Sequence, residues 1–407
     1  MISVSSQIVP QTHTIPRSAY IHLPFCRRRC FYCDFPIAVI GDRQRGEPSR
    51  TIADYIATLC QEIAATATAG APLQTIFFGG GTPSLVSPPQ IGQILAALTQ
   101  QFGLDSQVEI SMEMDPGTFD AAQVQAYADL GVNRVSLGVQ AFQNSLLQAC
   151  GRTHRVQDIH EAVAWVCQAG ILNWSLDLIS GLPHQTLSQW QASVEAAIAL
   201  KPPHLSAYDL VLEPTTAFGK SYQPGNAPLP TDDQAAQMYR WVSARLRAAQ
   251  YEHYEISNYA QPGYQCRHNR VYWHNQPYYA FGMGATSYRE RQRLTRPRTR
   301  IGYLQWVAAI QATGTWPQIC PDTPSDVLLE TLMLGLRLTE GIPIRFLQAQ
   351  FGAPVVTRLL AGLVPWQQQG YVWIDPPKRA DPRIRLSDPE GLLFSNAVLG
   401  TVWELFG

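Results

Sequence analysis

Residues 19–33 have the sequence AYIHLPFCRRRCFYC, in which an apolar run that predicts a strand, 19–23, is followed by three cysteines. Cys26, Cys30 and Cys33 form a C-x₃-C-x₂-C run. Thiolates are soft ligands that suit iron–sulfur clusters or zinc, but structural zinc sites usually contain two C-x₂-C pairs. Three thiolates leave one iron of a [4Fe–4S] cluster open to another molecule. The run therefore favours a cluster-binding loop at a strand end, with a zinc site or buried thiols as the alternatives.

Beyond this loop, short apolar runs alternate with amphipathic stretches. Strands are predicted over 75–78, 108–114, 134–139, 174–179 and 205–210, helices over 51–67, 88–101, 121–130, 145–150, 156–169, 187–200 and 231–249, and a loop over 214–230. Strands that alternate with helices of about 10–15 residues indicate βαβ units and a parallel sheet. Six such units predict an α/β fold, a partial (β/α)₆ TIM-like barrel over 17–250, after a flexible leader over 1–16.

The rest of the chain has a different pattern. Residues 251–320 are predicted to connect two domains, and they contain six arginines between Arg289 and Arg300 at a period close to two. This period predicts a β-hairpin with one charged face. Arginines suit paired recognition of carboxylates, although we favour a solvated hairpin. Residues 321–407 combine helical stretches with two short strands, which predicts a helix-rich, winged-helix-like domain.

The composition excludes several classes of protein. Apolar residues make up 46% of the chain and charged residues 15%, as in a globular protein, and the net charge of −1 does not suit a nucleic-acid-binding protein. We see no apolar run near the roughly 18 residues of a membrane span, and residues 1–16 do not resemble a secretory signal. The eight cysteines do not form a secreted disulfide framework. We therefore expect a cytoplasmic protein without a membrane span, and peripheral membrane contact stays open.

Polar or glycine-rich residues follow the predicted strands. They are Gly79-Gly80-Gly81-Thr82-Pro83, Glu113, Gln140, Asp177 and, in the turn before a helix, Arg152. Active sites of barrels lie at the carboxyl ends of the strands, and a glycine backbone can approach a ligand closely. For any single polar residue at a strand end, a structural role in a helix cap or an ion pair is as good an explanation as contact with a ligand. Five strand ends on one rim favour a ligand that they share.

The C-x₃-C-x₂-C run at a strand end, with an aromatic residue before its last cysteine, resembles the signature of radical S-adenosylmethionine (radical-SAM) proteins. Six stretches resemble the family of oxygen-independent coproporphyrinogen III oxidases and their relatives: 20–26, 77–85, 112–117, 136–142, 151–154 and 177–183. The similarity extends from about residue 17 to the C terminus. It implies a radical-SAM barrel with a C-terminal domain of the HemN type, a [4Fe–4S] cluster on the three cysteines, and bound S-adenosylmethionine (SAM).

The same resemblance, applied motif by motif, implies a set of SAM contacts. They are Tyr20, Tyr32, Gly80, Gly81, Thr82, Glu113, Gln140, Arg152 and Asp177, with a backbone contact near Val211. We expect N–H groups of the glycine turn to hold the methionyl part of SAM, and Glu113 to bind its amino or ribose groups.

Two branches of this family differ beside the cluster loop. The oxidase branch carries a fourth cysteine two residues after the third, whereas here Asp34 and Phe35 follow Cys33. The heme chaperone branch, HemW, has Cys-Asp-Phe there and an H-N-x-x-Y-W motif, which residues 268–273 match. The resemblance to this branch implies a protein that binds heme as cargo, passes it to apo-hemoproteins and lacks oxidase activity. Whether SAM is cleaved stays open. The alternatives are a coproporphyrinogen III oxidase of porphyrin biosynthesis and a radical-SAM enzyme with an unrelated substrate.

The H-N-x-x-Y-W motif supplies the candidate heme contacts. Imidazole is a common axial ligand of heme iron, and on a helix His268 and Tyr272 share one face, with Trp273 beside it. These three residues are our candidates, against a structural cluster that only covers the barrel mouth. The fallback ligands are His253, His274 and Cys266.

Overall fold

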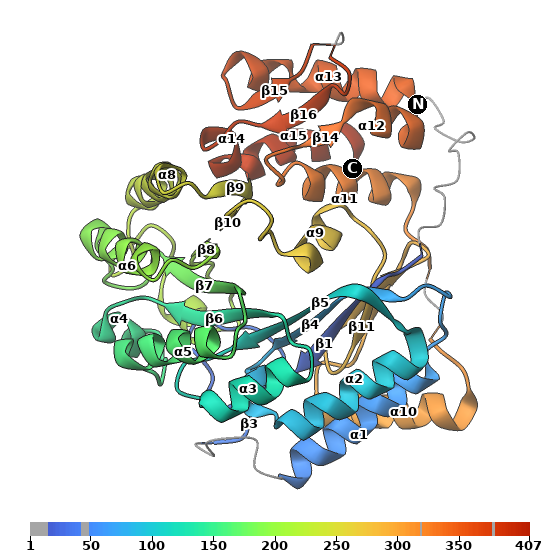
Figure 1. Ribbon diagram of the computed structural model, residues 1–407. Coiled ribbons are helices and arrows are strands. Elements are labelled where there is room, and N and C mark those ends of the chain that lie inside the picture. Colours follow the sequence, from blue (N-terminus) through green and yellow to red (C-terminus); the bar gives the residue numbers. More distant parts are fainter. Residues whose placement is uncertain (1–14, 42–48, 318–319, 377–378) are drawn as a thin grey trace.

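The computed structural model describes residues 15–41, 49–317, 320–376 and 379–407, so almost all of the predicted leader lies outside the described residues. A nine-stranded sheet in the order β11-β1-β4-β5-β6-β7-β8-β10-β9 forms the centre of the molecule (Figure 1). Six of its parallel strands, β1, β4, β5, β6, β7 and β8, follow the order of the sequence, and β11 pairs in parallel with β1. The six strands span Ser18–Leu23, Leu73–Gly80, Leu104–Met114, Arg134–Gln140, Asn173–Ser180 and His204–Asp209. The predicted six-unit barrel is confirmed.

Helices cover the outer face of this sheet (Figure 1). They are α1 (Arg50–Ala65), α2 (Pro88–Phe102), α3 (Ala121–Asp129), α4 (Asn144–Ala149), α5 (Val156–Gln168), α6 (Leu187–Ala199) and α8 (Asp232–Ala248). Capping boxes begin several of them; in α8, for example, Thr231 pairs with Gln234. The predicted loop over 214–230 contains a short helix, α7 (Ala217–Ser221), because the Thr216 hydroxyl accepts a hydrogen bond from the Gly219 N–H.

Residues 251–320 do more than connect two domains. They add β9 (Glu252–Glu255) and β10 (Asn258–Ala260) beyond β8, and β11 (Tyr279–Phe281) beside β1. Helix α9 (Arg267–Trp273) lies between these strands in the sequence. These three strands were not predicted, because three or four residues are too few to show a period of two.

The arginine segment forms the predicted hairpin, although its charges do not share one face. Strands β12 (Thr286–Arg289) and β13 (Gln292–Thr295) pair in antiparallel fashion, and α10 (Arg300–Thr313) follows. Arg296 is buried, and its Nε lies 2.7 Å from Glu62 Oε1 in α1. The preferred solvated hairpin is therefore wrong for Arg296, because this side chain holds the hairpin against the helical layer.

The C-terminal region has a hydrophobic core of its own. It comprises α11 (Pro324–Gly335), β14 (Ile342–Pro343), α12 (Ile344–Phe351), α13 (Ala353–Gln368), β15 (Val372–Ile374), β16 (Arg383–Leu386), α14 (Glu390–Leu393) and α15 (Ser395–Phe406). Its strands form a small sheet in the order β14-β16-β15. In Figure 1 this unit lies beyond β9 and α9, on the side of the sheet away from α1 and α2. No described helix has the length and apolar character needed to cross a membrane.

Candidate functional site

The three cysteines of the C-x₃-C-x₂-C run lie on one loop at the end of β1. Cys26 ends the two-residue strand β2 (Phe25–Cys26), which pairs with β3 (Ala38–Val39), so the chain folds back on itself around Cys30 and Cys33. All three thiols are free and partly exposed. Burial raises the pKa of the Cys26 thiol to about 12 and also raises that of Cys33. Metal binding would therefore have to displace thiol protons.

The loop fits a polynuclear cluster better than a single ion. Among the described residues, no three His, Cys, Asp or Glu side chains lie close enough together to hold one metal ion. Cysteines that bind an iron–sulfur cluster ligate its separate iron atoms, so they need neighbouring positions rather than a common centre. A loop that presents three partly exposed thiols side by side meets this requirement.

Two side chains from outside the loop reach toward the thiols, one after β4 and one in the turn between α4 and α5. Thr82 Oγ1 lies 3.7 Å from Cys26 Sγ, and Arg152 Nη1 lies 3.6 Å from Cys30 Sγ. Asp115 connects them, since Oδ2 accepts from the Thr82 hydroxyl at 3.1 Å and Oδ1 accepts from Arg152 Nη2 at 2.5 Å. No role was predicted for Asp115, which lies in the stretch 112–117. The available signal was its position directly after β5, two residues beyond Glu113.

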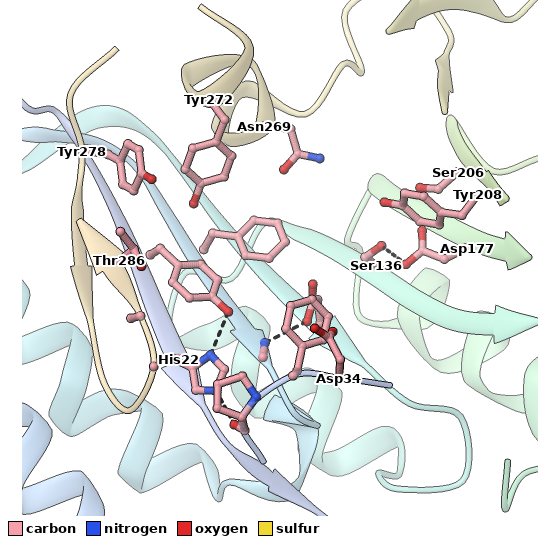
Figure 2. Close-up of a pocket in the computed structure, with 18 of the residues that line it drawn as sticks. His22, Asp34, Ser136, Asp177, Ser206, Tyr208, Asn269, Tyr272, Tyr278 and Thr286 are labelled. Atoms are coloured by element: carbon pink, nitrogen blue, oxygen red, sulfur yellow. Dashed lines mark hydrogen bonds between the residues drawn. The ribbon is translucent and has the colours of Figure 1, made fainter. Parts of the chain in front are cut away.

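A cavity of about 450 Å³, which we call the central cavity, lies on the inner face of the barrel (Figure 2). Its lining extends from Arg134 and His204, which begin β6 and β8, to Gly80, which ends β4. Of the predicted site residues it brings together Tyr20, Gly80, Glu113, Asp177 and Tyr272. The lining also includes residues for which no role was predicted, among them His22, Phe35, Phe77, Arg134, Ser136, His204, Ser206, Tyr208, Asn269, Tyr278 and Arg298. A volume in the range of about 300–1,000 Å³ suits one small-molecule ligand.

Two partly buried carboxyl groups, of Glu113 and Asp177, face the central cavity. Glu113 Oε2 accepts from the Gly80 N–H at 3.1 Å, and Asp177 Oδ2 accepts from the Ser136 hydroxyl at 2.6 Å (Figure 2). Burial, and then the charge of Asp177, raise the pKa of Glu113 to about 8. Burial also raises the pKa of Asp177. Arg134 lines the same cavity and its charge lowers both pKa values, but burial outweighs it. A further cationic ligand would therefore be stabilised here.

The glycine turn after β4 packs against the cysteine loop. Gly80 has a φ of +109°, and a Cβ there would lie 2.4 Å from the His22 ring. A Cβ on Gly81 would lie 2.7 Å from the Phe25 carbonyl oxygen. The N–H groups of Gly80, Gly81 and Thr82 donate to Glu113, Leu23 and Phe25. Our expectation that these N–H groups hold SAM therefore needs correction, because the turn already uses them to position the loop.

The remaining predicted contacts lie apart from the central cavity. Thr82 and Arg152 line a small cleft beside Cys30. Gln140, at a φ of +67°, is buried where β6 ends, and Tyr32 packs against the barrel core. The Val211 side chain, 65% exposed, follows β8 and is not among the residues that line the central cavity. The structure thus divides the predicted set between the cavity and the cysteine loop.

The predicted heme contacts also lie on different sides of α9. His268 is fully buried and stacks on Phe77; Nδ1 lies 2.7 Å from Thr75 Oγ1 and Nε2 lies 2.8 Å from the Tyr272 hydroxyl. Burial lowers its pKa to about 3. Tyr272 points into the central cavity (Figure 2), whereas Trp273 lines a separate hollow. Because both nitrogens of His268 have partners, ligation of iron by this residue would require α9 to rearrange.

Comparison with known proteins places this geometry in a family. The Radical SAM superfamily matches residues 20–197 and the HemN C-terminal domain matches residues 322–388. Heme chaperone HemW of Synechocystis is 46% identical over 408 residues, which cover 96% of this chain and 97% of that protein. The chain belongs to the HemW family. Escherichia coli HemW is 40% identical over 66% of this chain and 69% of its own length.

A solved structure shares the architecture of this HemW-family chain. Coproporphyrinogen III oxidase (HemN) of Escherichia coli superposes with a TM-score of 0.79, covering 95% of this chain and 90% of that one, at 22% identity. At this identity the likeness establishes the fold alone. It confirms the radical-SAM barrel with a HemN-type C-terminal domain.

Proposed function

We propose that this HemW-family chain is a heme chaperone that binds heme and transfers it to acceptor hemoproteins in the cytoplasm. The similarity to heme chaperone HemW over nearly the full length of both chains carries this proposal. Phe35 supports it locally, because this exposed phenylalanine lines the central cavity where the oxidase branch carries a fourth cysteine. The structural similarity to HemN is not evidence for oxidase activity, because it establishes only a shared fold.

We further propose that Cys26, Cys30 and Cys33 hold a [4Fe–4S] cluster and that SAM occupies the central cavity. A bound cluster would supply an electron beside that cavity. Arg152 would stabilise the Cys30 thiolate through its positive charge, and Asp115 would hold the Arg152 guanidinium and the Thr82 hydroxyl in position. Glu113 and Asp177 would bind the cationic groups of SAM, and the φ of Gly80 would keep its N–H on Glu113.

Charge reversal in the central cavity tests the SAM site. Glu113→Lys and Asp177→Lys should each weaken SAM affinity by roughly 100-fold, since loss of one partner from a buried charge pair costs about 2–5 kcal/mol. Isothermal titration calorimetry measures the affinity, and the visible absorption of the cluster should not change. Asp54→Lys, on the exposed face of α1, is the matched control. Unchanged SAM affinity in both cavity variants would remove the assignment.

The pH dependence of SAM binding gives a second readout of the same site. Because the pKa of Glu113 is raised to about 8, this carboxyl is protonated at lower pH in the ligand-free protein. Contact with an ammonium group requires the carboxylate, so SAM affinity should rise as the pH increases toward 8. Glu113→Gln should remove most of this rise.

One experiment with two arms distinguishes a heme chaperone from a coproporphyrinogen III oxidase. After anaerobic cluster reconstitution, heme titration should give a saturable change in the Soret band. Incubation with coproporphyrinogen III, SAM and a reductant should give no protoporphyrinogen, because hydrogen abstraction requires a near-attack position that Phe35 alters beside the cluster loop. Formation of that product at enzymatic rates would overturn the proposal in favour of the oxidase. Absence of both heme binding and product would indicate an unrelated substrate.

A further inference from the structure

A second large cavity, which we call the interdomain hollow, lies between the end of α9 and the C-terminal unit. Its volume is about 720 Å³. The residues that matter here are Trp273, His274, Ile342, Arg345, Phe346 and Arg383, from α9, β14, α12 and β16. The hollow differs from the central cavity in its lining, so a ligand in it would not displace one bound beside Glu113 and Asp177.

The walls of the interdomain hollow suit a flat apolar molecule. Trp273, Ile342 and Phe346 all line it, and Phe346 on α12 is 38% exposed. A phenylalanine and a tryptophan in the lining of one cavity offer aromatic faces for stacking. Among the described residues, none that lines this hollow is an aspartate or a glutamate.

The charged groups of the hollow are cationic. Arg345 is 72% exposed and reaches Asp381 at 3.0 Å, an exposed pair that a stronger partner can replace at little cost. Arg383 faces the hollow from β16, and within the described part of the chain its buried Nε has no hydrogen-bond partner. Two guanidinium groups at one cavity suit a ligand with two carboxylates.

His274 brings an imidazole to the same cavity. Burial, and then the charges of Arg270 and Arg383, lower its pKa against the opposing charge of Glu340, whose Oε1 lies 3.7 Å from Nε2, so the ring is neutral at pH 7. Its Nε2 accepts from Arg270 at 3.2 Å, but Arg270 also donates to Gln265 at 2.7 Å and Glu340 at 2.9 Å. Arg270 therefore keeps two partners if His274 turns to another ligand. A neutral imidazole that can be released in this way is the form that binds iron.

We propose that heme binds in the interdomain hollow, with His274 as an iron ligand, Trp273 and Phe346 against the ring, and Arg345 and Arg383 paired with the propionates. This inference rests on the proposed heme chaperone function and assigns its cargo a site. Cargo and SAM then occupy separate cavities that share α9 as a wall, since Tyr272 lines one and Trp273 lines the other.

Three porphyrins titrated into the reconstituted full chain test the site. His274→Ala should weaken binding of heme about tenfold or more and shift its Soret band, but leave binding of iron-free protoporphyrin IX unchanged, because only heme offers a metal. Arg345→Glu/Arg383→Glu should weaken heme binding to a similar degree, as expected for lost charge-assisted pairs. The same double variant should scarcely affect heme dimethyl ester, which lacks the carboxylates. Lysine at both arginine positions should restore part of the affinity.

Matched controls keep these outcomes specific. His160→Ala, on the exposed face of α5, and Arg358→Glu, on the exposed face of α13, should bind heme as the wild type does. SAM affinity in the central cavity should stay unchanged in every variant, which reports an intact fold. Saturable heme binding by the wild type that no hollow variant alters would overturn this site and leave the chaperone function standing. Lack of saturable heme binding by the wild type would overturn both.

Discussion

Replacing any one of Cys26, Cys30 and Cys33 with alanine should abolish the cluster after anaerobic reconstitution. The physical reason is that each thiolate holds its own iron atom, and the loop supplies three ligands for a four-iron group. The broad visible absorption, the EPR signal of the reduced state and the protein-bound iron should all fall to background.

Two exposed cysteines outside the loop provide the control for this result. Cys167→Ala and Cys320→Ala should reconstitute like the wild type, because neither belongs to the cysteine loop and both side chains are exposed. The cluster assignment would fail if the wild type held zinc stoichiometrically and took up no iron. It would also fail if a variant of the loop kept the full EPR signal.

The largest effect on stability should come from the buried pair of Glu62 and Arg296. Glu62 accepts hydrogen bonds from Arg296 at 2.7 Å, from the Tyr303 hydroxyl at 2.7 Å and from the Gly282 N–H at 2.9 Å. The pair thereby joins α1, α10, the end of β11 and the arginine hairpin. Glu62→Ala or Arg296→Ala should each lower the free energy of unfolding by about 3–5 kcal/mol, because the partner becomes an unpaired buried charge.

Urea unfolding followed by circular dichroism measures this loss as a lower midpoint. Arg293→Ala is the matched control in the same segment, since its pair with Glu330 is partly exposed and should contribute only about 1 kcal/mol or less. Replacing Glu62 and Arg296 together should cost less than the sum of the single changes. Equal midpoints for Arg296→Ala and Arg293→Ala would contradict the role given to this pair.

Long periodic segments made the barrel predictable. The helix predicted over 88–101 is observed as Pro88–Phe102, and the strand predicted over 134–139 as Arg134–Gln140. The apolar positions of such elements face one continuous core, so hydrophobic spacing alone identifies them. The short strands β9, β10 and β11 were missed because only their pairing makes them strands: β10 pairs with β8, β9 with β10, and β11 with β1.

The sequence by itself determined the features that depend on residues close together in the chain, or on the rule that the carboxyl ends of parallel strands meet at one edge of the sheet. These include the cysteine loop, and the meeting of Gly80, Glu113 and Asp177 around one cavity. Only the tertiary structure decided which groups are accessible. Both ring nitrogens of His268 are hydrogen-bonded, one to Thr75 and the other to Tyr272. Tyr272 and Trp273 line different cavities. The reason is that α9 is packed between the barrel and the C-terminal unit. Contacts between segments so far apart in the sequence produce no periodic pattern from which they could be predicted.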